Sequence, residues 1–121
     1  MTGTQAAALD RLIAILKSAR LRKPMYFAPV EPLLVEHWRH GLRTGCSLVG
    51  LEWSPEDRRP ALERRGLELS ANWELEQLAA RGLGSEAIVD ELLAIEVEMW
   101  QHVGGFDAKQ GVPADPPAAG R

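Results

Sequence analysis

Residues 71–103 read ANWELEQLAARGLGSEAIVDELLAIEVEMWQHV, and this stretch carries the strongest structural signal in the chain of 121 residues. Its second half repeats apolar side chains at the spacing of one helix face. The repeating side chains are Ile88, Leu92, Ile95 and Met99, broadened by Val89, Leu93 and Trp100. Glycines at positions 82 and 84 interrupt the pattern. We therefore expect one helix over about residues 73–81 and a second, capped by Ser85, that ends near His102.

Helical spacing recurs at the N-terminus. Thr2 or Thr4 is a suitable N-cap for a helix that ends near Arg20. The apolar row of this helix consists of Leu9, Leu12, Ile13 and Leu16. Prolines at positions 24, 29 and 32 cannot continue a helix, so residues 23–32 are expected to be extended, with Tyr26 and Phe27 covering an edge of the core.

Two more helices are expected between residues 32 and 66. The first begins near Pro32, and its inward stripe is predicted to be Leu34, Trp38, Leu42 and Cys46, with Val35, Gly45 and Val49 beside it. Gly41 and Gly45 each cost a helix interior about 1 kcal/mol relative to Ala, and we interpret them as letting another helix approach closely. The second helix covers residues 55–65, with Ser54 as N-cap and Gly66 as C-cap.

Together these segments predict an all-α fold, a compact bundle of about five helices in one domain over residues 1–103. Residues 104–121 are rich in Gly, Pro and Ala and are expected to form a flexible tail. The single cysteine, Cys46, excludes an internal disulfide and is interpreted as a small buried residue. Apolar runs fall short of the roughly 18 residues that cross a bilayer, and no basic segment precedes the first apolar stretch. We therefore expect a cytoplasmic protein without membrane contact.

Charge is distributed unevenly along the chain. Residues 1–66 carry eleven Lys and Arg against seven Asp and Glu, whereas residues 67–103 carry eight Asp and Glu against Arg81 alone. On the last helix we place Glu86, Asp90, Glu98 and Gln101 on an outer face, near Glu74 and Glu76. The face is either a solvated surface or a docking surface for a basic protein partner.

The two helices around Gly82–Gly84 also have the spacing of a helix–turn–helix DNA reader. The would-be recognition helix has no Lys or Arg, and it carries Glu86, Asp90, Glu91, Glu96 and Glu98. DNA affinity depends on cations that neutralise phosphates, so the charge disfavours a nucleic-acid partner.

A second candidate site is a metal site on Glu36, His37 and His40, since residues three and four apart share a helix face. The chain lacks the paired Glu-x-x-His motifs of helical di-metal proteins, and the histidines are displaced from the predicted inward stripe. Surface histidines are the competing interpretation. Cys46 lies six and nine residues from these histidines on the same helix, so no catalytic pair forms there, and we assign no catalytic residue and no cofactor.

Four tryptophans are present, of which Trp53 stands next to a turn. We expect Trp53 to be partly exposed, where it serves either as a core anchor or as an anchor in an interface.

The segment Arg22-Lys23-Pro24-Met25-Tyr26-Phe27 resembles the "RPxMYF/G" entry of small bacterial helical proteins, with Lys23 where that pattern has Arg. The sequences of residues 81–86 and 95–98 also resemble proteins of that kind. Some proteins with this entry are similar to immunity proteins, which neutralise a toxin by binding it, and the resemblance implies no catalytic residue. The leading hypothesis is thus a non-enzymatic protein-binding domain that uses Glu86, Asp90, Glu98 and Trp53. A metal-binding protein or enzyme, a DNA-binding regulator and a homodimer are the alternatives.

Overall fold

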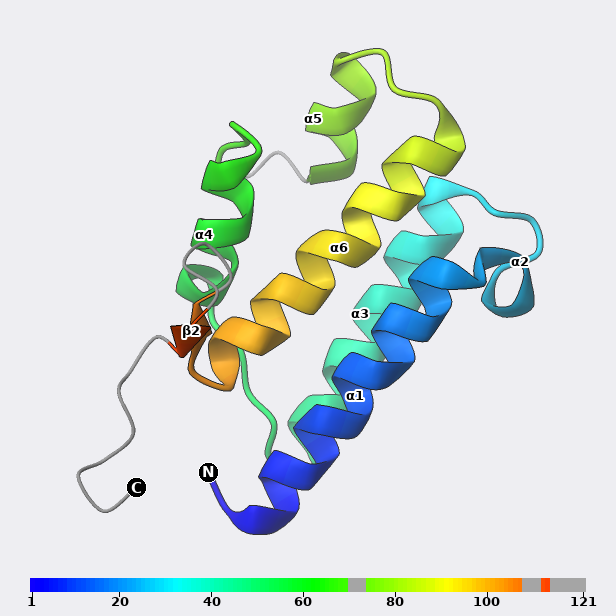
Figure 1. Ribbon diagram of the computed structural model, residues 1–121. Coiled ribbons are helices and arrows are strands. Elements are labelled where there is room, and N and C mark those ends of the chain that lie inside the picture. The colour runs from blue at the N-terminus through cyan, green and yellow to red at the C-terminus, as the bar shows by residue number, and fades with distance from the viewer. Residues whose placement is uncertain (70–73, 108–111, 114–121) are drawn as a thin grey trace.

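A computed structural model describes residues 1–69, 74–107 and 112–113, and it is an all-α helical bundle (Figure 1). The helices are α1 (Gly3–Leu21), α2 (Lys23–Tyr26), α3 (Pro32–Leu48), α4 (Pro55–Arg64), α5 (Glu74–Ala80) and α6 (Ser85–Val103). Two short strands follow, β1 (Phe106–Asp107) and β2 (Val112–Pro113), and they pair antiparallel. The all-α prediction is confirmed. The helix that was not predicted is α2, a single turn within residues 23–32, which were expected to be extended. Within this described part, no helix combines the length and apolarity needed to cross a membrane.

The helix ends follow from local sequence. Thr2 is the N-cap of α1 and forms a capping box with Gln5, as expected for one of the two predicted threonines. At α6 the cap is Gly84, one residue before the predicted Ser85, which is instead the first helical residue. The predicted first residue of α5, at position 73, and most of the predicted tail lie outside the described residues.

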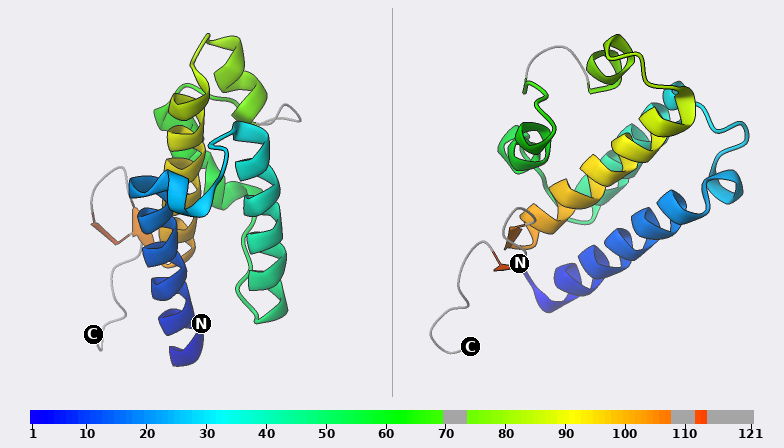
Figure 2. Two further views of the ribbon diagram at one scale, coloured as in Figure 1. Left: turned by 90° about the vertical axis from the view of Figure 1, so that its right-hand side faces the viewer. Right: turned by 45° about the horizontal axis from the view of Figure 1, so that its top comes forward.

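Helix α6 is the centre of the bundle and packs against α1, α3, α4 and α5 (Figure 1). Its predicted apolar row is buried in full, and Trp100 is completely covered. Helices α1 and α3 run antiparallel on one side of α6 and are joined by α2 at one end (Figure 2). Phe27 fills the core beside α2, with its ring 5.1 Å from that of Trp38 at a T-shaped angle, which confirms its predicted place.

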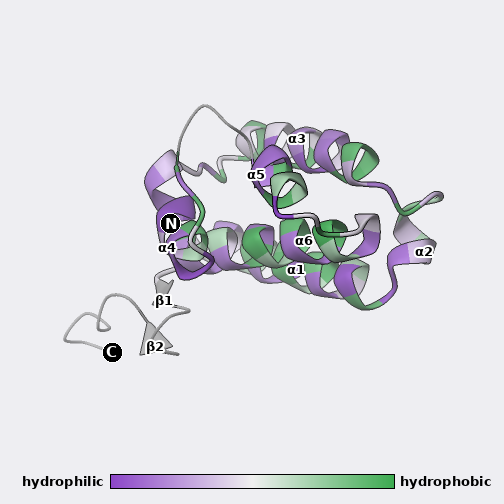
Figure 3. Cartoon of the chain, turned by 90° about the horizontal axis from the view of Figure 1, so that it is seen from above, coloured by the Kyte–Doolittle hydropathy of each residue, from purple (hydrophilic) through white to green (hydrophobic). Residues whose placement is uncertain are grey.

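The hydropathy and burial of α3 and α4 show which core residues the sequence did not predict. Helix α4 is largely hydrophilic and contributes Ala61 and Leu62 to the core, whereas α3 carries hydrophilic and hydrophobic residues on different faces (Figure 3). The buried residues of α3 are Val35, Glu36, Arg39, Arg43 and Cys46. The predicted burial of Val35 and Cys46 is confirmed, and Trp38 and Leu42 of the predicted inward stripe are partly buried and pack against the core. The prediction is wrong for Leu34 and Val49, which are exposed, and it missed the buried arginines of α3.

Candidate functional site

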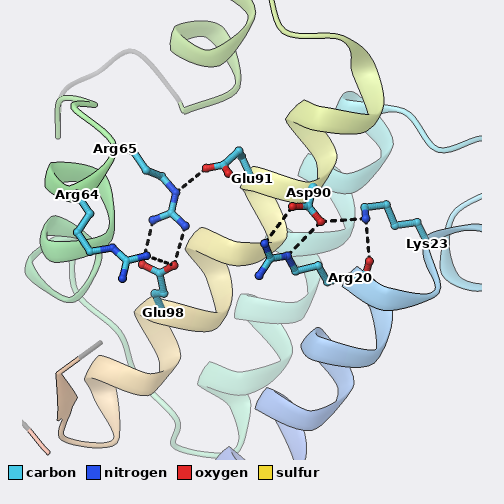
Figure 4. Close-up of polar contacts among 7 residues, drawn as sticks. All are labelled: Arg20, Lys23, Arg64, Arg65, Asp90, Glu91 and Glu98. Atoms are coloured by element: carbon cyan, nitrogen blue, oxygen red, sulfur yellow. Dashed lines mark hydrogen bonds and ion pairs between the residues drawn. The ribbon is translucent and has the colours of Figure 1, made fainter. Parts of the chain in front are cut away.

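The predicted acidic face of α6 is bound to the basic N-terminal half of the chain. Asp90 accepts hydrogen bonds from Arg20, whose Nη2 lies 3.0 Å from Oδ2, and from Lys23, whose Nζ lies 2.9 Å from Oδ1 (Figure 4). The hydrogen bond from Arg20 lowers the pKa of Asp90 and outweighs the opposing effect of burial. Asp90 is therefore a link between α6 and the end of α1.

Glu91 and Glu98 make the same kind of link on the other side of α6. Arg65 reaches both carboxylates, with Nε 2.6 Å from Glu91 and Nη2 2.6 Å from Glu98, and Arg64 adds a contact of 2.9 Å to Glu98 (Figure 4). Glu86 is exposed, and among the described residues it has no ion pair. The uneven charge along the sequence is thus largely used inside the fold, because the acids of α6 bind cations of the first 65 residues.

The fifth acid of α6, Glu96, is completely buried and holds two arginines of α3. Arg43 donates from Nε to Oε2 at 2.9 Å and from Nη2 to Oε1 at 2.6 Å, and Arg39 donates from Nη1 to Oε1 at 3.2 Å. The indole N–H of Trp100 donates to Oε2 at 3.1 Å. Burial raises the pKa of Glu96, but the hydrogen bond from Arg43 and the charges of both arginines outweigh it, so the pKa lies below its usual value.

Around this centre lies a buried ion cluster of six side chains: Glu36, Arg39, Arg43, Arg58, Glu74 and Glu96. Arg39 also binds Glu36 and Glu74, and Arg58 of α4 binds Glu74 of α5. Burial and the nearby charges of Arg43 and Arg39 lower the pKa of Arg58 to about 10, so it stays protonated at neutral pH. Three cations balance three anions, and the cluster joins α3, α4, α5 and α6.

Trp53 lies at the outer edge of this cluster and is half-buried, so its predicted partial exposure is confirmed. The guanidinium carbons of Arg43 and Arg58 lie 4.6 and 5.8 Å from the centre of its ring. These three side chains, with His40, Thr44 and Ser47, line a pocket of about 380 Å³. Both arginines are paired with buried carboxylates, although the Nε of Arg58 has no hydrogen-bond partner among the described residues. Trp53 therefore has an internal role in holding the two cations.

The predicted metal candidates do not gather into a site. His37 and His40 are both exposed, and Nε2 of His40 lies 3.8 Å from Glu36, which is itself bound to Arg39. Within residues 1–69, 74–107 and 112–113, no three His, Cys, Asp or Glu side chains are placed to hold a metal ion. Burial, reinforced by the charge of Glu96, raises the pKa of the Cys46 thiol, so Cys46 is a protonated core residue.

The apolar stripe predicted to face inward on α3 packs against the core at Trp38, Leu42 and Cys46 but is exposed at its two ends. Leu34, Leu48 and Val49 are 40%, 83% and 63% exposed, and Gly41 and Gly45 are exposed between them. The side of the helix that faces α6 carries Arg39 and Arg43, which bind Glu96, together with the buried Val35. We call the exposed apolar side the outer face of α3, which consists of Leu34, Gly41, Gly45, Leu48 and Val49, with the partly buried Leu42 at its border with the core.

The outer face continues into a groove of about 330 Å³ between α3 and α1. Gly41, Leu42 and Gly45 line one wall, and Ala8 and Ile15 line the other. Apart from the nearby backbone of α3 itself, a Cβ atom added at Gly41 or Gly45 would meet no atom of the described residues within 4 Å, so the predicted close approach of another helix does not occur among them.

Comparison with protein-family models, curated proteins and solved structures finds no match for this chain. The site therefore rests on its own geometry. Of the predicted docking residues, Asp90 and Glu98 bind cations of this chain. Glu86 is exposed and makes no ion pair with the described residues. The outer face of α3 was not predicted as a docking surface. Its signal was present in the sequence, because Arg39 and Arg43 lie four apart on one side of a helix whose opposite side is apolar.

Proposed function

We propose that the protein is a non-enzymatic protein-binding domain whose partner covers the outer face of α3. The observation that carries this proposal is the orientation of α3, which buries two arginines and exposes an apolar side. Contiguous exposed apolar surface is typical of interaction sites in globular proteins. An immunity-like or antitoxin-like role is one form of this function.

The glycines of the outer face support the same proposal. Each glycine inside a helix costs about 1 kcal/mol relative to alanine. Gly41 and Gly45 bring no compensating contact within the described chain, since the space beside them is open. A partner that packs closely against α3 would use that space.

The earlier hypothesis of a basic partner on Glu86, Asp90 and Glu98 remains a prediction, but two of its three residues already bind cations of this chain. A partner can bind the outer face without breaking any of the ion pairs described above. It is therefore the better supported docking surface.

Affinity capture from cells of the source organism tests the proposal, with the intact protein compared with Leu48→Glu. A matched control is Ala79→Glu, which places the same charge on the exposed side of α5, away from the groove. We expect a protein that is retained by the intact chain and by Ala79→Glu and lost with Leu48→Glu. Equal recovery of every captured protein by all three chains would contradict the proposal.

A further inference from the structure

We infer that the element bound by the groove between α1 and α3 is an amphipathic helix of a partner protein, with acidic side chains beside its apolar row. This inference rests on the proposed function and specifies the chemistry of the partner. It reverses the sign of the partner charge expected from the sequence.

The shape of the groove fits a helix. Its walls are α1 and α3, which run antiparallel (Figure 2). The lining residues run from Ala8 to Ile15 on α1 and from Gly41 to Cys46 on α3, and Val49 and Leu51 follow after the end of α3. Seven or eight residues of helix rise by about 10–12 Å, which is about two turns of an inserted helix. Gly41 and Gly45 are one turn apart and have no side chains, so the backbone of the inserted helix can come close to α3. An apolar helix face in a groove is a common mode of peptide recognition.

The charges beside the groove select an acidic partner. Arg11 is the one charged residue that lines the groove, and it is exposed. Arg22, the exposed C-cap residue of α1, lies beyond the end of the groove and adds a second positive charge near it. In the described part of the chain neither arginine makes an ion pair, whereas Arg20 and Lys23, which lie between and beside them in sequence, both bind Asp90. The groove thus has apolar walls and unpaired positive charge at its edge.

A second copy of this chain fits that charge poorly. In a symmetric dimer the same patch faces itself. Both copies would then bring Arg11 to the interface, and neither groove contributes an Asp or Glu. An acidic amphipathic helix supplies the missing carboxylates and places its apolar side chains against Ile15 and Leu42.

The test is a display library of helical peptides about five turns long, with leucines fixed along one face and the flanking positions free to be Glu, Lys, Ser or Gln. We expect selection on the purified protein to enrich Glu at the flanking positions. A selected peptide and its Glu-to-Lys counterpart are then compared by fluorescence anisotropy, and the Lys form should bind about tenfold more weakly at low salt. Arg11→Glu should reverse that order.

Gly45→Leu fills the groove and should abolish peptide binding, whereas Ala79→Leu, which adds the same side chain on α5, should leave it unchanged. Enrichment of Lys, or no enrichment at all, would overturn the inference. So would a dimer in analytical ultracentrifugation that Gly45→Leu dissociates, because a second copy would then occupy the groove. If a captured partner is lost with Leu48→Glu but no acidic helix is selected, the proposed function stands and this inference alone fails.

Discussion

The two sides of helix α3 differ in what they bury and what they expose. Its inner side buries Arg39 and Arg43 against α6, whereas its outer face exposes Leu48 and Val49. Val35 and Cys46 are also buried, so the helix combines apolar contacts with the two arginines. The difference shows that charge pairing with Glu96 contributes to the packing of α3 against α6, while Leu48 and Val49 contribute little to the core.

Removal of the buried anion should break this arrangement most severely. Glu96→Ala leaves Arg39 and Arg43 without their shared carboxylate, and removal of one partner from a buried ion pair costs about 3–5 kcal/mol. We expect a loss of this size in the free energy of unfolding, measured by urea denaturation.

Glu98→Ala is the matched control on the same helix. Glu98 also binds two arginines, Arg64 and Arg65, but these contacts are partly exposed to solvent. Exposed or partly exposed pairs contribute about 1 kcal/mol or less. Equal losses for the two variants would mean that the inner side of α3 has no special role in the fold.

Substitution of a glycine on the outer face should raise the free energy of unfolding, whereas Glu96→Ala should lower it. Gly45→Ala adds a Cβ in open space and should stabilise the protein by about 1 kcal/mol, because alanine is the better helix former. The control is Gly50→Ala, at a φ of 85° and with Gln5 Nε2 2.6 Å from the added Cβ, which should destabilise. Thermal and urea unfolding both report the difference. A destabilising Gly45→Ala would place an unseen contact of the fold itself at this position.

The sequence was sufficient to predict the helices and the central part of the apolar stripe of α3, but not the burial of Arg39 and Arg43. Periodicity places α1, α3, α4 and α6 to within about two residues, because apolar spacing and caps are local properties. Which side of α3 faces the core depends on Glu96, which lies 53 residues after Arg43. Leu34 and Val35 each begin a row of side chains along α3 that could face the core. The local sequence does not distinguish the two rows, and the contact of α3 with α6 decides between them.

Contacts between residues far apart in sequence also explain why the acidic residues of α6 were interpreted as a docking surface. A block of acids on one helix looks like a surface when the sequence is read locally. In the fold, Asp90 meets Arg20 across 70 positions of sequence. The excess of cations in residues 1–66 was the available signal that these acids had internal partners, although it did not indicate which ones.

The link between Asp90 and α1 should make a small, pH-dependent contribution to stability. The lowered pKa of Asp90 means that its contribution is present above the pKa of the unfolded chain, about 3.9, and is lost as the pH falls through the lower folded value. Asp90→Asn should therefore cost about 0.5–1 kcal/mol at pH 7, discounted because the pair is partly exposed. Urea denaturation of both proteins between pH 7 and 3 should show the difference shrinking in acid. A difference that grows in acid would contradict this sign.

The smallest effect is expected on the exposed apolar side chains, and it separates function from folding. Leu48→Gln removes an apolar group that is already in water, so the free energy of unfolding should change by no more than about 0.5 kcal/mol. Substitution of a core leucine such as Leu92 by Ala, in contrast, should cost about 2–5 kcal/mol. If Leu48→Gln folds as well as the unaltered protein but loses the captured partner, Leu48 contributes to recognition and not to the core. If it is strongly destabilising, the outer face of α3 is covered in the free protein, and the distinction between the two sides of α3 does not hold.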